Sequence, residues 1–220
     1  INLPLIVYWM IVADFRYKMG KIIIEVDQML TSSIEIKRPS WNDMFKFYPN
    51  SQIKTIDLYE SIGGGLPQYY KNDPISWENS CAIRMSKALN YSGVSLPNAP
   101  SRGGTIIGKD KYKYWIRVAD LKKYLYELFN EPDIEEKAGP NAVDKFNNKK
   151  GIIVFEVSGW GNASGHFTLW DGKHLIYPGN PNHDDPNSIY YYFNMKYSVH
   201  LSDNRKREVK TQRILLWELK

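Results

Sequence analysis

The hydrophobic pattern of the chain changes from helical to strand-like about two thirds of the way along. In the first part, apolar residues recur every three or four positions, which predicts helices with one face on a core; the segments are 40–48, 53–62, 79–92 and 119–129. In the last part, β-branched and aromatic runs alternate with turn residues, which predicts strands; the runs are 151–157, 166–170, 173–177, 189–193 and 213–219. We therefore expect an α+β fold in which N-terminal helices pack on a C-terminal antiparallel sheet.

The connections between these segments are polar. Residues 130–150 read as a long surface loop, and Asp171-Gly172 predicts a two-residue hairpin turn before the returning strand. Ahead of the helices, Lys21–Asp27 predicts one more strand. The segment Ile1–Ala13 is apolar but shorter than a bilayer span and has no basic segment before it, so we expect neither a signal peptide nor an anchor. We expect residues 1–20 to be an N-terminal extension and residues 21–220 a single domain.

Cys81 lies in the first turn of the helix predicted over residues 79–92. Asn79 or Ser80 is expected to cap this helix, and Ser92-Gly93 to end it. A cysteine at this position feels the positive end of the helix dipole, which favours the thiolate and lowers the pKa of the thiol. The alternative is a buried structural cysteine, because free cysteine is among the residues most often buried.

His166 begins a predicted strand directly after a glycine-rich connector, which places its ring at the rim of the sheet. A rim histidine can act as the base for a cysteine on a helix packed against that sheet, in a papain-like order of cysteine before histidine. The alternative is a histidine at a strand end with no catalytic role. The other three histidines, His174, His183 and His200, lie in a hairpin, a loop and a polar turn.

The composition of the chain excludes some kinds of site but does not indicate one function. The single cysteine excludes an internal disulfide and a cysteine-rich zinc site. The net charge of +5 and the 16 tyrosines and 7 tryptophans suit an anionic or polar partner in an aromatic groove, without choosing among nucleic acid, a lipid surface and a cell wall. His183-Asp184-Asp185 is a poor metal site because adjacent residues seldom converge on one ion, so we expect no metal and no cofactor.

Several motifs in order resemble the fourth family of type VI secretion amidase effectors. They are Pro39-Ser40-Trp41, Tyr48-Pro49, Ile62-Gly63-Gly64, the segment from Asn79 to Gly93, the segment from Gly165 to Gly172, and the closing Leu215-Leu216-Trp217-Glu218-Leu219. The resemblance implies a papain-like cell-wall peptidase fold with Cys81 as nucleophile and His166 as base. It further implies hydrolysis of the peptidoglycan stem-peptide bond between γ-D-glutamate and meso-diaminopimelate.

The same resemblance implies where the protein acts and with what. It implies synthesis in the bacterial cytoplasm, delivery without a signal peptide by the type VI apparatus, action in the periplasm of a rival cell, and neutralisation by a dedicated immunity protein. We expect neither nucleic-acid binding nor insertion into a membrane. Two other functions stay open: a wall-binding protein of the same fold with impaired catalysis, and a transferase or deamidase that uses the same pair.

One departure from that family concerns the third catalytic member. The family has an aspartate about eleven residues after the histidine, and that place falls near Tyr177 here. Asp171 belongs to the turn, so the group that orients His166 is expected from Asp184, with Asn180, Asp185 and Tyr177 as alternatives. The oxyanion hole is expected from the backbone N–H of Cys81 and a neighbour at the helix start. Candidate substrate-binding residues are Trp77, Trp160 and Arg84.

Overall fold

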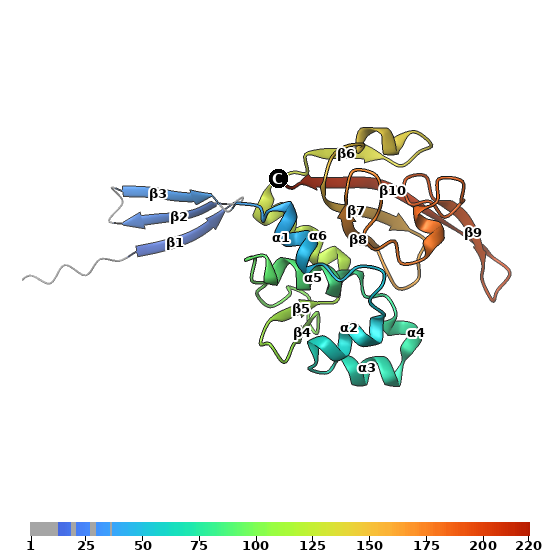
Figure 1. Ribbon diagram of the computed structural model, residues 1–220, viewed down its shortest axis with the longest axis horizontal. Coiled ribbons are helices and arrows are strands. Elements are labelled where there is room, and N and C mark those ends of the chain that lie inside the picture. Colours follow the sequence, from blue (N-terminus) through green and yellow to red (C-terminus); the bar gives the residue numbers. More distant parts are fainter. Residues whose placement is uncertain (1–12, 19–20, 27–29, 36) are drawn as a thin grey trace, which may run out of the picture.

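Helices and an antiparallel sheet form two layers in the body of the protein (Figure 1). The computed structural model describes residues 13–18, 21–26, 30–35 and 37–220, with side chains from Lys37 onward. The helices are α1 (Trp41–Phe47), α2 (Thr55–Ile62), α3 (Leu66–Asn72), α4 (Pro74–Trp77), α5 (Cys81–Tyr91) and α6 (Val118–Phe129), with 3₁₀ turns η1 (Ala142–Lys145) and η2 (Pro181–Asp184). The α+β arrangement expected from the sequence is confirmed.

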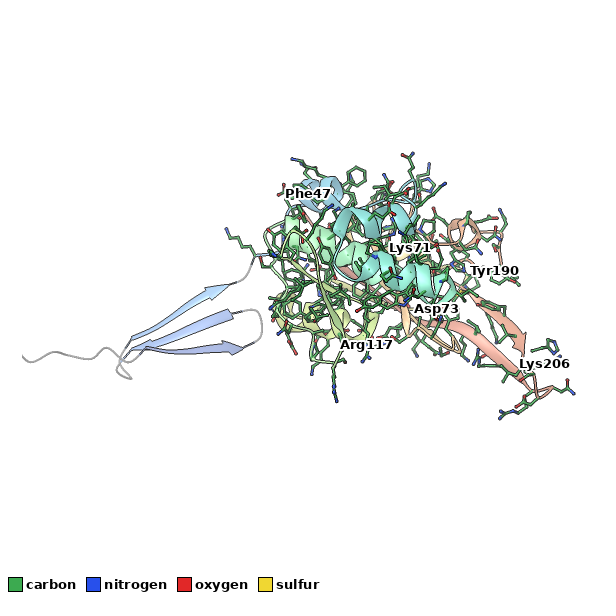
Figure 2. All side chains as sticks on the ribbon, turned by 90° about the horizontal axis from the view of Figure 1, so that it is seen from below. Phe47, Lys71, Asp73, Arg117, Tyr190 and Lys206 are labelled. Carbon is green, nitrogen blue, oxygen red and sulfur yellow. The ribbon has the colours of Figure 1, made fainter. Side chains whose placement is uncertain are left out.

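The sheet of the body has the order β6-β10-β7-β8, and β9 pairs with the first half of β10. All of its pairs are antiparallel; the strands are β6 (Ile134–Lys137), β7 (Gly151–Ser158), β8 (Gly165–Trp170), β9 (Lys196–His200) and β10 (Lys206–Glu218). A separate hairpin joins β4 (Thr105–Ile107) to β5 (Lys113–Trp115). Figure 2 shows the β9–β10 hairpin extending from the body, with Lys206 near its end.

The central strand β7 is buried on both faces, which explains its continuous run of apolar residues. Ile152 and Val154 pack with α5 and α6 in one core, whereas Ile153 and Phe155 pack in a second core on the opposite face. This alternation follows from the two-residue period of a strand. The first core fixes α5 against β8, and that contact brings the two candidate catalytic elements together.

The N-terminal strands form their own sheet in the order β1-β2-β3; they are β1 (Ala13–Lys18), β2 (Lys21–Val26) and β3 (Leu30–Glu35). The strand expected at Lys21–Asp27 is confirmed as β2, and Figure 1 shows this sheet beside the body rather than within it. The boundary expected after residue 20 falls between β1 and β2, which pair with each other. The division into domains stays a prediction. The apolar segment 1–12 lies outside the described residues, and among the described helices none is long and apolar enough to cross a bilayer.

The strand expected at residues 173–177 is wrong. Asp171 accepts the N–H groups of Lys173 and His174, and this closes a wider turn than the expected two-residue one. Only the bridge between Trp170 and Leu175 follows. The chain then leaves the sheet, because the N–H of Tyr177 donates to the side-chain oxygen of Thr168 at 2.9 Å instead of continuing the strand pairing.

Two further expectations need correction. Residues 189–193 form turns rather than a strand: the aromatic side chains of residues 191–193 lie in the second core, while the N–H groups of Tyr191 and Tyr192 bond to the carbonyls of Ser188 and His183. The expected long loop 130–150 contains β6 and η1, since Ile134–Lys137 pairs with the second half of β10. In both cases tertiary packing decides the local structure over the sequence pattern.

Candidate active site

Cys81 is the first residue of α5, as the sequence predicts. Ser80 precedes the helix, but its hydroxyl accepts a hydrogen bond from Nε of Arg84 at 2.9 Å and does not cap the helix start. The expected side-chain cap is therefore wrong. Almost every residue of α5 is buried, so the helix is held by packing on all sides and does not depend on a capping side chain.

The thiol of Cys81 is 1% exposed, and this burial raises its pKa. The backbone N–H groups of Phe167 and Ala82 and the positive charge of Arg84 act in the opposite direction, because each favours the thiolate. We expected the helix start to lower the pKa of the thiol, and this expectation is wrong. Desolvation outweighs the helix start because the sulfur is enclosed in the first core.

His166 is the second residue of β8 and is paired with Phe155 of β7. Its ring is 4% exposed and stacks on Tyr192, with ring centroids 4.8 Å apart, while the ring of Tyr177 lies at 5.7 Å. The histidine is thus at the start of the strand as expected, but between two tyrosines rather than at an open rim. Burial lowers its pKa to about 4, since the imidazolium loses its hydration there.

Nε2 of His166 lies 2.7 Å from the carbonyl oxygen of Tyr177. A carbonyl oxygen only accepts, so Nε2 carries the proton and donates it. The other ring nitrogen, Nδ1, is then left unprotonated in the neutral ring and can accept a proton. The arrangement is that of a base whose tautomer is fixed by a main-chain acceptor.

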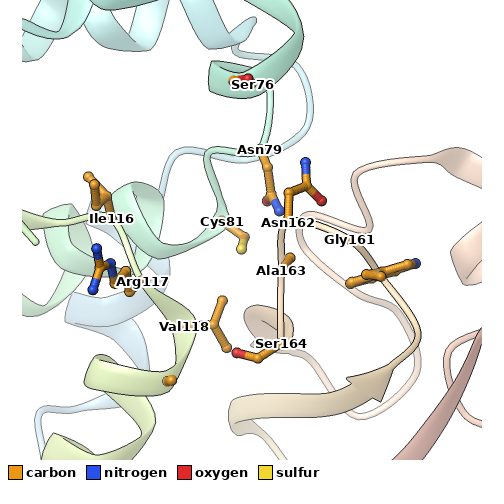
Figure 3. Close-up of a pocket in the computed structure, with 12 residues that line it drawn as sticks. Ser76, Asn79, Cys81, Ile116, Arg117, Val118, Gly161, Asn162, Ala163 and Ser164 are labelled. Carbon is orange, nitrogen blue, oxygen red and sulfur yellow. The ribbon is translucent and has the colours of Figure 1, made fainter. Parts of the chain in front are cut away.

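Two adjoining cavities connect the cysteine and the histidine. Cys81 lines a cavity of about 430 Å³, and His166 lines one of about 630 Å³. The two cavities share four lining residues: Asn79, Trp160, Asn162 and Ala163. Figure 3 shows the sulfur of Cys81 pointing into the first cavity, with Asn79 and Asn162 above it. We call the two cavities together the cleft.

The structure also brings Cys81 of α5 next to β8, the strand of His166. The N–H that favours the Cys81 thiolate belongs to Phe167, the residue after His166. A charge on Cys81 also raises the pKa of Tyr192, on which the ring of His166 stacks. A helix-borne thiol and a strand-borne imidazole beside one cleft can together attack a carbonyl carbon.

Comparison with known proteins shows the family of the chain. Residues 77–217 match the family model described as type VI secretion system amidase effector protein 4, Tae4. The chain belongs to the Tae4 family. The matched residues contain α5, β8 and both sides of the cleft. No match was found among curated protein sequences.

Solved structures of this family are similar in fold. The effector in the Tae4–Tai4 effector–immunity structure from Salmonella typhimurium is 27% identical, with a TM-score of 0.61, over 84% of this chain and 100% of that one. Tae4 from Enterobacter cloacae is 26% identical, with a TM-score of 0.60, over 85% of this chain and 100% of that one. The Tae4–Tai4 complex from Enterobacter cloacae matches at 25% identity and a TM-score of 0.60, over 84% of this chain and 100% of that one. These matches confirm the α+β fold.

The carboxylate expected to orient His166 does not do so. Asp184 lies with a carboxylate oxygen 3.5 Å from Nδ1 of His174 and accepts the N–H of Leu175. Asn180 and Asp185 accept N–H groups of their own turns. Of the four candidates, only Tyr177 bonds to the histidine, through its carbonyl. Asp184 therefore does not contact His166, and Tyr177, expected only as an alternative, does.

Of the three expected substrate-binding residues, one lines the cleft and two do not. Trp160 lines both cavities, with its indole N–H donating to the hydroxyl of Tyr197 at 3.0 Å. Trp77 instead stacks on Tyr69, with ring centroids 5.0 Å apart, and lines neither cavity of the cleft. Arg84 is 1% exposed and enclosed by protein acceptors, so the expectation that it binds substrate is wrong.

Sequence reasoning missed several residues of the cleft. Tyr192 was assigned to a strand and His183 to a loop with no role, yet both line the cavity of His166, with their rings 4.3 Å apart. Asn79 and Asn162 were not considered for the cleft wall. The one feature of the sequence that could have indicated a cleft residue is the position of Asn79, two residues before the cysteine. In the part of the chain that the structure describes, no group of three or more metal-binding side chains occurs.

Proposed function

We propose that the protein is a peptidoglycan amidase that works through Cys81 and His166. The amidase class follows from membership in the Tae4 family. The observation that carries the assignment of residues is the position of the Cys81 thiol beside the N–H of Phe167, next to His166 on β8. The bond cleaved is that between γ-D-glutamate and meso-diaminopimelate, which is the substrate that the resemblance of the sequence implies.

The proposed reaction uses the free ring nitrogen of His166. Nδ1 takes the proton of the Cys81 thiol as the sulfur bonds to the amide carbon, and the carbonyl π electrons move to oxygen. The C–N bond then breaks, and the amine leaves with the proton from His166. Water adds to the thioester in the same way, which releases the acid and restores the thiol. The carbonyl of Tyr177 accepts from Nε2 throughout, so the ring keeps one orientation while Nδ1 gains and loses the proton.

The oxyanion that forms in this reaction needs hydrogen-bond donors at the helix start. The backbone N–H of Cys81 is one of them, as the first residue of α5. The side-chain amides of Asn79 and Asn162 both line the cavity of Cys81, so each is a candidate for the second donor. We assign this role to Asn79, because it lies two residues before the nucleophile at the start of the same helix.

The biological setting follows from the same family. We propose that the protein is delivered by a type VI secretion apparatus into the periplasm of a rival cell without a signal peptide, and that it acts on the wall there. The related effectors from Salmonella typhimurium and Enterobacter cloacae were solved with the immunity protein Tai4. We propose that a cognate immunity protein neutralises this effector in the cell that makes it.

Mass spectrometry of muropeptides tests the proposal. Purified wall material is incubated with the wild type and with Cys81→Ala, and circular dichroism confirms that both are folded. The wild type should release fragments cut between γ-D-glutamate and meso-diaminopimelate, with one water added for each cut, and Cys81→Ala should release none. Equal digestion by both proteins would refute the assignment of the nucleophile. Products that carry another acceptor, or that lose only ammonia, would identify a transferase or a deamidase.

One observation favours a second function, that of a wall-binding protein with impaired catalysis. The Cys81 thiol is 1% exposed and its pKa is raised, and both features lower the reactivity of a cysteine. Alkylation with iodoacetamide distinguishes the two functions. Modification of Cys81 that destroys turnover supports the amidase. An unreactive thiol in a protein that sediments with wall fragments and releases no products supports the binding protein.

A further inference from the structure

Arg84 is a buried cation that has no acidic partner among the described side chains. Its guanidinium donates to the carbonyl oxygens of Pro49, Asn50 and Ile53 at 2.7–3.0 Å, and its Nε donates to the hydroxyl of Ser80. All of these acceptors are neutral. None of the ion pairs found from residue 37 onward includes Arg84. Burying a charge is costly, so a buried guanidinium with only neutral acceptors calls for an explanation beyond ordinary packing.

The remaining face of this guanidinium lies on the ring of Tyr177. Cζ of Arg84 is 4.0 Å from the ring centroid, which is a close cation–π contact. The hydroxyl of the same tyrosine is 3.4 Å from the hydroxyl of Ser80, which also accepts from Arg84. The ring of Tyr177 is thus attached to the start of α5.

The main chain of Tyr177 is attached to β8 instead. Its N–H donates to Thr168 at 2.9 Å, and its carbonyl accepts from His166 at 2.7 Å. One residue therefore joins the helix of the nucleophile to the strand of the base. Arg84 is three residues after Cys81, so its guanidinium and the thiol move together with the first turn of α5.

We propose that Arg84 is a positioning residue that holds the ring of Tyr177, so that the carbonyl of Tyr177 keeps His166 oriented toward the helix of Cys81. The proposal rests on the proposed function, because it assigns the base to His166. In this arrangement the orienting role that a carboxylate side chain has in related enzymes is divided between a main-chain acceptor and a buried cation. The cation holds the tyrosine and does not touch the substrate.

The test separates the ring of Tyr177 from its carbonyl. Tyr177→Leu removes the ring and keeps the carbonyl, whereas Tyr177→Phe keeps the ring and removes only the hydroxyl. Arg84→Met removes the cation, and Arg84→Lys keeps a charge without the planar fork. Lys87→Met is the matched control, because it removes a cation from the same helix at a partly exposed position outside the cleft. Circular dichroism establishes which variants fold.

Two readouts are measured on these variants. The first is kcat and KM for release of muropeptides. The second is the Nε2–H signal of His166 in nitrogen-edited NMR spectra without substrate, recorded in the Cys81→Ala background as well. If the positioning role is correct, kcat falls about tenfold or more in Tyr177→Leu, with KM changed by less than about twofold, because a displaced base costs rate rather than binding. The Nε2–H signal should be lost in Tyr177→Leu and retained in Tyr177→Phe and Lys87→Met.

The outcomes are distinct. Loss of both kcat and signal in Tyr177→Leu, with the same losses in a folded Arg84→Met and partial recovery in Arg84→Lys, supports the proposal. An unchanged Nε2–H signal in Tyr177→Leu overturns the proposal. An unchanged kcat in this variant despite a lost signal overturns it as well. If Arg84→Met does not fold, the two Tyr177 variants alone decide. Because the NMR measurement needs no turnover, it still tests the positioning role if Cys81→Ala shows that the proposed reaction is wrong.

Discussion

The imidazole of His166 donates from Nε2 to the main-chain carbonyl of Tyr177, 2.7 Å away, eleven residues later in the chain. A carbonyl fixes the tautomer of the ring as a carboxylate does, but it carries no full negative charge to stabilise an imidazolium. The buried cation of Arg84 disfavours the imidazolium further. The catalytic pair is therefore expected to rest as a neutral thiol and a neutral imidazole rather than as an ion pair.

The first prediction concerns Asp184. Asp184→Asn should keep kcat/KM within about twofold of the wild type, because the carboxylate contacts His174 and Leu175 and not His166. The stability should change by less than about 1 kcal/mol, since His174 is largely exposed. Muropeptide release and urea unfolding measure the two effects. If Asp184 did orient the histidine, the loss of rate would be on the order of a hundredfold or more.

The second prediction concerns the pH dependence of activity. The charged or titratable groups around His166 are Arg84, His183, Tyr177, Tyr192 and Cys81, and Arg84 and His183 lower its pKa in addition to burial. With a pKa of about 4, His166 is neutral and able to act as a base from about pH 5 upward.

The profile of kcat/KM should therefore have an acid limb near pH 4 and no fall between pH 6 and 8. The measurement is kcat/KM across pH 4 to 9, with circular dichroism at each pH to exclude unfolding. A decline of activity as the pH rises from 6 to 8 would mean that an imidazolium is needed. That result would contradict the neutral pair.

The third prediction concerns stability. The pKa of His166 is about 4 in the folded protein against an ordinary value of 6.5 for histidine, so between these pH values the unfolded chain binds a proton that the folded protein does not. The stabilising contribution is complete above pH 6.5 and is lost as the pH falls towards 4. Between pH 7.5 and pH 5 this loss is about 2 kcal/mol.

Urea unfolding at pH 7.5 and at pH 5 measures this loss in the free energy of unfolding. The wild type should lose about 2 kcal/mol more than His166→Gln over this interval, because glutamine does not titrate. His200→Gln is the control, since it removes an exposed imidazole from the end of β9. Equal losses in the wild type and in His166→Gln would show that the buried imidazole does not carry this pH dependence.

The fourth prediction concerns Trp160, which lines both cavities of the cleft. Trp160→Ala should raise KM up to about tenfold with a smaller change in kcat, because the indole offers contact area but no group to the chemistry. Trp160→Phe keeps a ring next to Tyr192, so its KM should lie between the values of the wild type and Trp160→Ala. A large fall in kcat with constant KM in Trp160→Ala would instead place the indole next to the reacting atoms.

Much of the fold and half of the site could be predicted from the sequence. The helix of Cys81 and the strand of His166 follow from apolar spacing and from the glycine-rich connector, and both lie where they were expected. The pKa direction of Cys81 was wrong because a helix start is a local feature, whereas enclosure depends on the distant residues that cover the sulfur. The turns at 189–193 were missed because aromatic residues fit a strand and a core equally well.

The sequence offers Tyr177 only as an alternative for the orienting group, because a main-chain acceptor has no side-chain signature. A carboxylate is visible in a sequence, which favours Asp184, whereas carbonyl oxygens are present at every position and carry no information. The deciding event is the departure of the chain from the sheet after Leu175, where Thr168 takes the N–H of Tyr177. That bond depends on a side chain nine residues earlier, and the ring of Tyr177 contacts Arg84 of α5.

A main-chain carbonyl acceptor is present whichever residue type occupies the position. Substitutions at Tyr177 therefore act on this contact only by moving the oxygen, as we expect for Tyr177→Leu, and substitutions at Arg84 or Thr168 act on it in the same way. The position of the acceptor thus depends on three side chains, those of Arg84, Thr168 and Tyr177, whereas an enzyme that relies on one aspartate depends on a single residue.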